Sequence, residues 1–338
     1  MIAAVASTAM VGRVAAQPSP GAVPRALPLS PEVEAFIEEM VDRHAFERDA
    51  LRATFAQVRI QQQVLGAMHS QSRPRPWFEY RPAFVNRPRI AGGARFWQEN
   101  AAVLERAQAQ YGVPAELVVA TIAAETLFGK MMGSHPVLDS LATLAFEFPK
   151  RAPFFRGELE QFLLLARELS IDPAQPRGSF AGAMGIPQFM PTSYRKYAVD
   201  FDADGRIDLF RSAADAIGSV ANYYRVFGWV SGGPVAVRAS APVDLAEAQA
   251  KLGIKPHTTV GALAALGIAA NPPHAAELDP SLPAMVFPLI MKEGTEYWLG
   301  FDNFFVITRY NRAIHYAMAV FELAREIRAL RAGPTARS

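Results

Sequence analysis

The stretch Pro114-Ala-Glu-Leu-Val-Val-Ala-Thr-Ile-Ala-Ala-Glu125-Thr-Leu-Phe-Gly129 predicts a short apolar helix that carries one carboxylate near its end. Pro114 suits the first helical turn, and Glu116 complements the positive end of the helix dipole. Gly129 favours a left-handed stop. The rest of the chain is interpreted by its relation to Glu125, which falls in the last turn of this helix.

The neighbours of Glu125 decide what its carboxylate can do. On a helix, Thr121, Ile122 and Phe128 lie three or four residues away, so the acid is set in a largely hydrocarbon face. Desolvation and the negative helix end should both raise its pKa, as a general acid requires. The alternative is a helix-terminal Glu that points to solvent, because glutamate is rarely buried without a partner. This stretch alone leaves the two interpretations balanced.

Composition excludes several classes of function. The chain has 338 residues, a formal net charge of +2 and a pI near 8.9, so it lacks the strong positive field of a nucleic-acid binder. Cysteine is absent. That absence excludes disulfides, thiolate metal sites, a cysteine nucleophile and a lipid-modified N-terminal cysteine. A chain of this length can hold two or three lobes.

The N-terminus indicates export. Residues 2–11 form a weakly apolar run, and Val14-Ala15-Ala16-Gln17 is small enough for a signal-peptidase site. The charged start that normally precedes such a run is missing, so the pattern predicts an imperfect export signal, with a disordered tail as the alternative. No later segment has the ~18 consecutive apolar residues of a membrane span.

The remaining pattern is mainly helical with one small α+β insertion. Apolar periodicity predicts helices, in chain order, at about 31–41, 49–68, 94–111, 138–146, 154–169, 215–228 and from Asn311 onward, the last capped by that residue. Residues 70–95 are rich in Pro and Arg and are expected to form an extended crossing strap. In the insertion we expect a strand at 235–238, a helix at 245–252 and an antiparallel pair, 287–290 with 296–301, around Gly294.

A glycine-rich stretch at 178–191 predicts a tight loop. Three glycines and two prolines in so short a run let a ligand or another backbone come close. Ser179 and Gln188 are its hydrogen-bonding side chains, suited to sugar hydroxyls or an acetamido group. A buried connector between helices is the alternative.

The next stretch matches the first nine positions of a calcium loop. Oxygen ligands stand at one, three, five and nine, Gly205 takes the turn at six, and a backbone carbonyl at seven completes the set. The expected ligands are Asp200, Asp202, Asp204, Arg206 through its carbonyl, Asp208 and Asp215. Arg211 replaces the usual Glu at position twelve, so Asp215 would reach round from the following helix. Ser212 and Asp215 also form a capping-box pattern, which is the alternative for that residue.

One acid in an apolar helix, a glycine-rich loop with amide and hydroxyl groups, and aromatic residues together fit carbohydrate cleavage. The six histidines show no metal-ligand spacing, and no Ser-His-Asp elbow or phosphate-binding motif is present. Ordinary glycosidases need a second carboxylate. Asp139, Glu147 and Asp172 are the candidates, and none stands in a clearly catalytic context. A single-acid mechanism must find its nucleophile in the substrate.

Several motifs in one order carry a resemblance to a known family. They are Ala124-Glu125-Thr126-Leu-Phe-Gly129, Phe148-Pro149-Lys150-Arg151, Gly178-Ser179 to Gly185 with Pro187-Gln188-Phe189-Met190-Pro191, Asp215 to Tyr223, and Thr308-Arg-Tyr310-Asn311. Together they resemble the lytic murein transglycosylase B family over nearly all of the chain after about residue 30.

The resemblance implies a lysozyme-like catalytic core and non-hydrolytic cleavage of peptidoglycan. Glu125 would protonate the oxygen of the β-1,4 bond between N-acetylmuramic acid and N-acetylglucosamine, then deprotonate the muramyl C6 hydroxyl. That hydroxyl closes onto C1 and gives a 1,6-anhydro end. The alternatives are a hydrolytic muramidase and an inactive glycan-binding scaffold.

The resemblance also implies the binding residues and the setting. Ser179, Gln188, Tyr80, Tyr223, Tyr310, Asn311 and Tyr316 would line the glycan cleft, while Lys150 and Arg151 approach the acidic lactyl or peptide part. The first of those two positions is commonly arginine in the family, so a bidentate contact there is in doubt. We expect no cofactor for catalysis, a structural Ca²⁺, glycan strands and other cell-wall enzymes as partners, a monomer, and a soluble periplasmic form without a lipid anchor.

The expected organisation follows the chain. It comprises a signal-like segment and linker at 1–29, a helical lobe and strap at 30–93, a lysozyme-like core at 94–231 with the calcium-type loop at 200–211, a small α+β lobe at 232–303, and a C-terminal helix at 304–338 that returns to the core.

Overall fold

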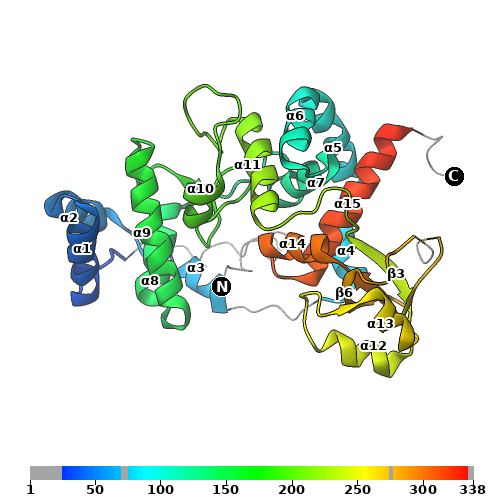
Figure 1. Ribbon diagram of the computed structural model, residues 1–338. Coiled ribbons are helices and arrows are strands. Elements are labelled where there is room, and N and C mark those ends of the chain that lie inside the picture. The colour runs from blue at the N-terminus through cyan, green and yellow to red at the C-terminus, as the bar shows by residue number, and fades with distance from the viewer. Residues whose placement is uncertain (1–24, 70–74, 274–276, 334–338) are drawn as a thin grey trace.

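The fold is mainly helical, with a five-stranded sheet at its edge (Figure 1) and a two-stranded pair, β1 (His135–Pro136) with β2 (Arg177–Gly178). A computed structural model describes residues 25–69, 75–273 and 277–333. The expected signal-like segment up to residue 24 therefore lies outside the described residues. This mainly α architecture with a β-containing part agrees with the fold class expected from the sequence.

Helix α7 (Ala115–Thr126) lies at the centre of the helical body. Every residue of this helix is buried except Glu116 and Glu125. Its apolar side chains, each contributing roughly 1.5–3 kcal/mol on full burial, pack against α5 (Arg87–Glu99), α6 (Ala101–Tyr111), α11 (Ala213–Val226) and α15 (Ile314–Ala332). A helix covered on nearly all sides is a rigid support for Glu125.

Helices α1 (Pro31–His44) and α2 (Arg48–Gln57) form a lobe beside the body at the left of Figure 1, whereas α3 (Gln62–His69) lies apart from them in this view. The single helix expected from about 49 to 68 is wrong, because Val58 ends α2 in an extended conformation and Ile60 forms a backbone bond with Arg25. This part of the chain packs against α8 (Val137–Glu147) and α9 (Ala152–Glu168), which are separated by a short turn of 3₁₀ helix at Pro149–Arg151.

The expected extended strap is also wrong, because the described part of residues 70–95 is helical. It contains α4 (Trp77–Phe84) and the first part of α5. Asn86 caps α5 by accepting a hydrogen bond from the Arg89 amide, and Pro88 lies in the first turn, where proline costs no hydrogen bond. The helix expected at 94–111 is two helices, α5 and α6, which meet at Asn100.

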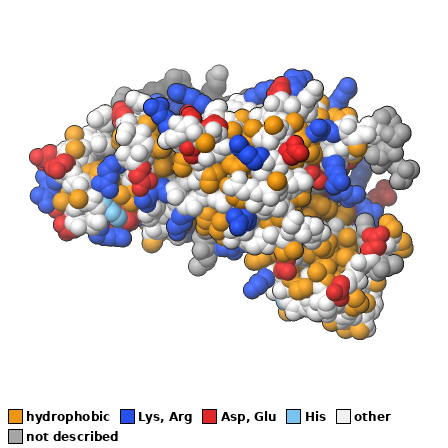
Figure 2. Space-filling model, turned by 45° about the horizontal axis from the view of Figure 1, so that its top comes forward, with side chains coloured by type: hydrophobic (Ala, Val, Ile, Leu, Met, Phe, Trp, Pro, Cys, Tyr) orange, Lys and Arg blue, Asp and Glu red, His pale blue; other side chains and the backbone are white. Residues whose placement is uncertain are grey.

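The small lobe contains a five-stranded antiparallel sheet in the order β4-β6-β7-β3-β5. The strands are β3 (Ala236–Ser240), β4 (Thr258–Thr259), β5 (Ala269–Ala270), β6 (Pro283–Ile290) and β7 (Thr295–Gly300), with α12 (Val243–Ala250) and α13 (Val260–Ala265) between them. The expected pair around Gly294 is β6 with β7. Figure 2 shows hydrophobic side chains gathered on the lobe at the lower right, and Val243, Leu252 and Ile290 are among its exposed residues.

Two further helices return the chain to the body. Helix α14 (Asp302–Tyr310) is followed by three residues and then by α15, which packs along α7 and α5. Asn311 does not cap α15 as expected, since the N-cap is Ala313; instead the Asn311 side chain accepts a hydrogen bond from the Ala313 amide at 3.1 Å. Within the described residues, none of the helices is both long enough and apolar enough to cross a bilayer.

Candidate active site

Helix α7 ends in a strained turn directly after Glu125. Leu127, Phe128 and Gly129 all have left-handed backbone angles, with φ of 50°, 62° and 80°. For the two residues that carry a Cβ this conformation costs roughly 1–2 kcal/mol each. Phe128 therefore leaves the helix, so the sequence-based expectation that it neighbours Glu125 on a helical face is wrong. Its ring instead stacks on Phe96 at 5.2 Å.

Thr126 holds this turn in place. Its hydroxyl donates a hydrogen bond to the carbonyl oxygen of Ile186 at 2.7 Å and accepts one from the Gly129 amide at 2.9 Å. Ile186 belongs to the glycine-rich loop that the sequence singled out. The residue next to Glu125 is thus fastened to that loop, which brings the two together.

Glu125 is a desolvated acid with one strong hydrogen bond. Burial raises its pKa from 4.5 to about 7, and a hydrogen bond from Tyr316 opposes the rise. The Tyr316 hydroxyl donates to Glu125 Oε1 at 2.5 Å. The residue as a whole keeps some exposure, although dense surrounding protein desolvates its carboxyl group. Desolvation is the larger of the two effects, so the carboxyl group is accessible and yet holds its proton up to about pH 7.

Glu125 has no carboxylate partner among the described residues that shifts its pKa. The three candidates for a second acid are used elsewhere. Asp139 accepts hydrogen bonds from the Arg59 amide and the Gln61 side chain, Glu147 pairs with Arg25 at 2.8 Å, and Asp172 accepts from the Ala174 amide. The arrangement is therefore that of a single general acid.

Four tyrosines surround this acid, and each hydroxyl is satisfied within the protein. Tyr316 donates to Glu125, Tyr310 to the Pro187 carbonyl at 2.5 Å, and Tyr223 to the Arg309 carbonyl at 2.7 Å. Tyr224 lies 2.8 Å from the Thr121 hydroxyl, which itself donates to Leu117, so Tyr224 is the donor of that pair. Burial and the charge of Glu125 raise the pKa of all four phenols, which stay protonated at neutral pH.

The glycine-rich loop folds back on itself beside the turn. Ser179 is buried and accepts a hydrogen bond from the Ala183 amide, which leaves its own proton available. Gln188 has a φ of 50° and donates both amide hydrogens, to the carbonyls of Met132 and Gly185 at 3.0 Å. Its carbonyl oxygen remains as an acceptor. Each expected binding residue of this loop thus keeps one hydrogen-bonding function for a ligand.

The other expected binding residues lie on separate elements. Tyr80, on α4, stacks on Phe84 and Trp77, and its hydroxyl has no hydrogen-bond partner among the residues described. Asn311 is buried in the link between α14 and α15. Lys150 is exposed before α9, and the neighbouring Arg151 guanidinium lies over the Phe154 ring at 4.6 Å.

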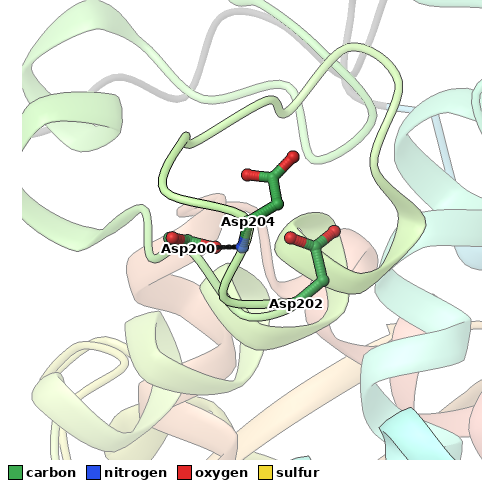
Figure 3. Close-up of side chains that lie close together, drawn as sticks. All are labelled: Asp200, Asp202 and Asp204. Carbon is green, nitrogen blue, oxygen red and sulfur yellow. Dashed lines mark hydrogen bonds between the residues drawn. The ribbon is translucent and has the colours of Figure 1, made fainter.

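The calcium-type loop lies between α10 (Pro191–Tyr197) and α11. Carboxylate oxygens of Asp200, Asp202 and Asp204 lie within 4.8 Å of one another (Figure 3). Such hard oxygen donors at this spacing fit a divalent cation such as Ca²⁺. Asp208 accepts hydrogen bonds from the amides of the two residues that follow Leu209.

Asp215 fastens the two sides of this loop. One of its oxygens accepts from the Phe201 amide and the other from the Asp208 amide, both at 2.7 Å. Ser212 caps α11 by accepting from the Asp215 amide, and its hydroxyl donates to Asp202. The Arg206 amide donates a hydrogen bond to Asp204 at 2.8 Å.

Sequence reasoning missed two contacts of this site, although it named Thr121 as a neighbour of Glu125. Tyr224 donates a hydrogen bond to Thr121, and Thr126 ties the turn after Glu125 to the glycine-rich loop. In the sequence, only the positions of these residues could have indicated a role. Tyr224 follows Tyr223, Thr126 follows Glu125, and Thr121 lies one helical turn before Glu125. Their partners are far away in the chain, so spacing could not assign these contacts.

Comparison with known proteins agrees with this geometry. Residues 29–325 match the family described as Transglycosylase SLT domain. The chain belongs to this family. It is 42% identical over 308 residues to the membrane-bound lytic murein transglycosylase B of Escherichia coli K12, which covers 88% of this chain and 83% of the relative. The protein is therefore a lytic transglycosylase, as the sequence predicted.

Solved structures of other members have the same fold. The soluble lytic transglycosylase SltB1 of Pseudomonas aeruginosa is 45% identical with a TM-score of 0.84, covering 90% of this chain and 100% of that one. Escherichia coli Slt35, solved in complex with calcium, is 42% identical with a TM-score of 0.80, covering 89% and 94%. The more distant SltB3 of Pseudomonas aeruginosa, solved with NAG-anhNAM-pentapeptide, is 29% identical with a TM-score of 0.76, covering 88% and 79%.

Proposed function

We propose that this lytic transglycosylase cleaves the β-1,4 bond between N-acetylmuramic acid and N-acetylglucosamine in peptidoglycan without using water. The observation that carries the proposal is that Glu125, whose pKa is raised to about 7, is accessible and has no second carboxylate beside it among the residues that the structure describes. A hydrolase of the usual kind needs two carboxylates. The anhydro ligand of the SltB3 complex is the product type that this reaction makes.

Glu125 acts in both halves of the reaction. As an acid it gives its proton to the glycosidic oxygen while the bond from that oxygen to C1 of the muramyl sugar breaks. As a carboxylate it then takes the proton of the muramyl C6 hydroxyl, whose oxygen forms the new bond to C1. Glu125 gives up one proton and takes one back, so it is protonated again at the end of the cycle. A pKa near neutrality suits both steps, because the protonated and the ionised form of Glu125 are both accessible.

The surrounding residues position the strand for this chemistry. Ser179 offers a hydroxyl proton, Gln188 a carbonyl oxygen and Tyr80 a free hydroxyl, all to sugar hydroxyls or acetamido groups. Asn311 and the Tyr223 and Tyr310 rings complete the wall, while Lys150 and Arg151 meet the acidic part of the substrate. Tyr316, which is fully buried, acts on the substrate through Glu125 rather than by contact.

Mass spectrometry of the products tests this proposal. Purified sacculi should yield muropeptides with anhydro ends, each lighter by one water than the product of a muramidase. The Glu125→Gln variant should bind sacculi and release nothing. Reducing ends from the parent protein would instead establish a hydrolase, and binding without turnover by the parent would establish a scaffold.

We further propose that the loop at 200–211 binds a structural Ca²⁺. The cluster of three aspartates supports this, and the Slt35 relative was solved with calcium. Asp200, Asp202 and Asp204 would supply carboxylate oxygens, Arg206 its carbonyl, and Asp208 and Asp215 their remaining lone pairs. The ion would stabilise the connection between α10 and α11 and take no part in the reaction.

We propose that the protein acts in the periplasm. The signal-like N-terminal segment and a cell-wall substrate support this location. The Escherichia coli relative is named membrane-bound. Fractionation of cells that express the protein tests the proposal, and recovery in the cytoplasmic fraction would contradict it.

A further inference from the structure

A hollow of about 700 Å³ lies at the opposite end of α7 from Glu125. Its lining includes Ala115, the first residue of α7, together with side chains of α5, α6 and α15, which pack together in the helical body (Figure 1). Ala115 precedes Glu125 by ten residues, which is about 15 Å along a helix. Small-molecule sites have volumes of roughly 300–1,000 Å³. The hollow is therefore large enough for a ligand and separate from the catalytic acid.

Contacts between these helices hold the walls of the hollow. The Arg331 guanidinium lies over the Trp97 ring, 4.3 Å from its centroid, which joins α15 to α5. Arg328 pairs with Glu116 at 3.1 Å, which joins α15 to α7. The Gln108 side-chain oxygen accepts a hydrogen bond from the first amide of α7 at 2.9 Å, which joins α6 to α7. The shape of the hollow thus exists before a ligand binds, so binding orders few side chains.

Several polar groups of the lining are left for a ligand. The Gln108 N–H groups, the Trp97 indole N–H and the Ser231 hydroxyl form no hydrogen bond within the part of the chain that the structure describes. Such donors suit hydroxyl and carbonyl oxygens. The Trp97 ring and the side chains of Ala101 and Ala109 add apolar surface beside these donors. The lining therefore fits a ligand that has both polar and apolar sides.

The charges of the lining cancel. Arg328 and Arg331 are positive, whereas Glu105 lines the hollow and Glu116 pairs with Arg328. Since the two signs are balanced, the field favours neither an anion nor a cation. The lining thus favours an uncharged ligand with several hydrogen-bonding groups.

The proposed substrate supplies such a ligand. N-acetylglucosamine is uncharged and carries hydroxyl and acetamido groups on an apolar ring, whereas the anions of a peptidoglycan strand belong to its lactyl groups and peptides. We propose that this hollow is a second glycan-binding site, which takes N-acetylglucosamine units while the catalytic cleft holds another part of the wall. Two linked contacts with one polymer raise the overall affinity, so the site retains the enzyme on the sacculus between cleavage events. The inference rests on the proposed function, because the polymer it names is the substrate of that reaction.

Binding of chitotetraose, an uncharged oligomer of N-acetylglucosamine without peptides, tests the second site. Isothermal titration calorimetry on the Glu125→Gln variant counts the bound ligands per chain without cleavage. Adding Ala109→Arg, which fills the hollow from an exposed position of α6, should lower that number by one and weaken binding to sacculi about tenfold or more. Adding Trp97→Leu, which removes the indole, should have the same effect. If Trp97→Leu is unstable, Ala109→Arg decides alone, because it removes no existing side-chain contact.

Ala53→Arg provides the matched control. Ala53 is an exposed alanine of α2, so this change adds the same side chain and charge to a helix that does not line the hollow. It should leave the number of bound ligands and the affinity for sacculi unchanged. Equal numbers of bound chitotetraose molecules in the Ala109→Arg and Ala53→Arg proteins would overturn the inference. A hollow that binds a free stem peptide and no chitotetraose would overturn it as well.

The two readouts separate this inference from the proposed function. If the parent releases anhydro ends from sacculi and Ala109→Arg loses no bound ligand, the second site fails and the proposed function stands. If the parent releases no anhydro ends and Ala109→Arg still loses one bound ligand, the proposed function fails and the hollow stands as a glycan-binding site.

Discussion

Removing the Tyr316 hydroxyl should shift the pH dependence of catalysis. Its hydrogen bond to Glu125 favours the ionised acid and so lowers a pKa that burial has raised. In Tyr316→Phe the pKa of Glu125 should therefore rise further above 7. Because Glu125 must be protonated to begin the reaction, activity in the parent falls as the pH rises through about 7. In the variant this loss should occur at higher pH.

The size of the shift follows from the bond that is lost. A hydrogen bond to a charged group contributes roughly 1.5–3 kcal/mol, and each pH unit corresponds to about 1.4 kcal/mol. The alkaline limb of the profile should thus move up by at least about one pH unit. With a higher pKa, Glu125 accepts the proton of the C6 hydroxyl more readily but gives its own proton to the glycosidic oxygen less readily. The maximum rate should therefore also fall.

The assay is the rate of anhydromuropeptide release from sacculi between pH 5 and pH 9, the range in which Glu125 titrates. Tyr224→Phe is the matched control, because Tyr224 is equally buried but donates to Thr121 rather than to Glu125. Its alkaline limb should stay in place. An unshifted limb in Tyr316→Phe, or an equal shift in both variants, would refute the link between this hydroxyl and the acidity of Glu125.

Three further predictions concern stability. The raised pKa of Glu125 means that ionising it in the folded state costs about 3 kcal/mol, a cost that appears as the pH rises from about 4.5 to about 7. At pH 8 the Glu125→Gln variant should therefore have a higher urea midpoint of unfolding than the parent, and at pH 4 it should not. Identical urea midpoints of the two proteins at pH 8 would contradict the desolvation of Glu125. Calcium should raise the melting temperature by a few degrees, and Asp202→Ala should abolish that rise; a parent indifferent to calcium would rule the ion site out. Gly133→Ala should lower the free energy of unfolding by at least about 2 kcal/mol, because the new Cβ would lie 2.1 Å from the Gly178 carbonyl oxygen. Gly157→Ala on α9 is the control, since its Cβ meets nothing within 4 Å and the change should be neutral or stabilising. Equal urea midpoints for the two variants would contradict this close approach.

The parts of the site that sequence could predict are those encoded locally. The apolar run before Glu125, the glycine-rich loop and the alternating aspartates each depend on residues a few positions apart. Helix α7 and the aspartate cluster accordingly lie where the sequence placed them. The family resemblance supplied the reaction, because several motifs in one order are more specific than any single helix.

The parts that sequence could not predict depend on distant partners. Glu125 and Tyr316 are 191 residues apart, so their hydrogen bond left no local pattern. The left-handed turn after Thr126 is stabilised by the Ile186 carbonyl, and its conformation at Leu127 and Phe128 contradicts local preference. The strap was mistaken for extended chain because prolines were counted without their positions, although Pro88 lies in a first turn that accepts it.

The assembly of the site from both halves of the chain has a consequence for the safety of the cell. An enzyme that cleaves peptidoglycan can damage the cell if it becomes active before it reaches its site of action. Here the acid arrives with α7, but its hydroxyl partner arrives only with α15, the last helix. A nascent or truncated chain that stops before residue 310 has the acid without Tyr310, Tyr316 and the helix α15 that packs along α7. The surroundings of Glu125 are therefore complete only when the C-terminal helix has been synthesised and has folded onto the body.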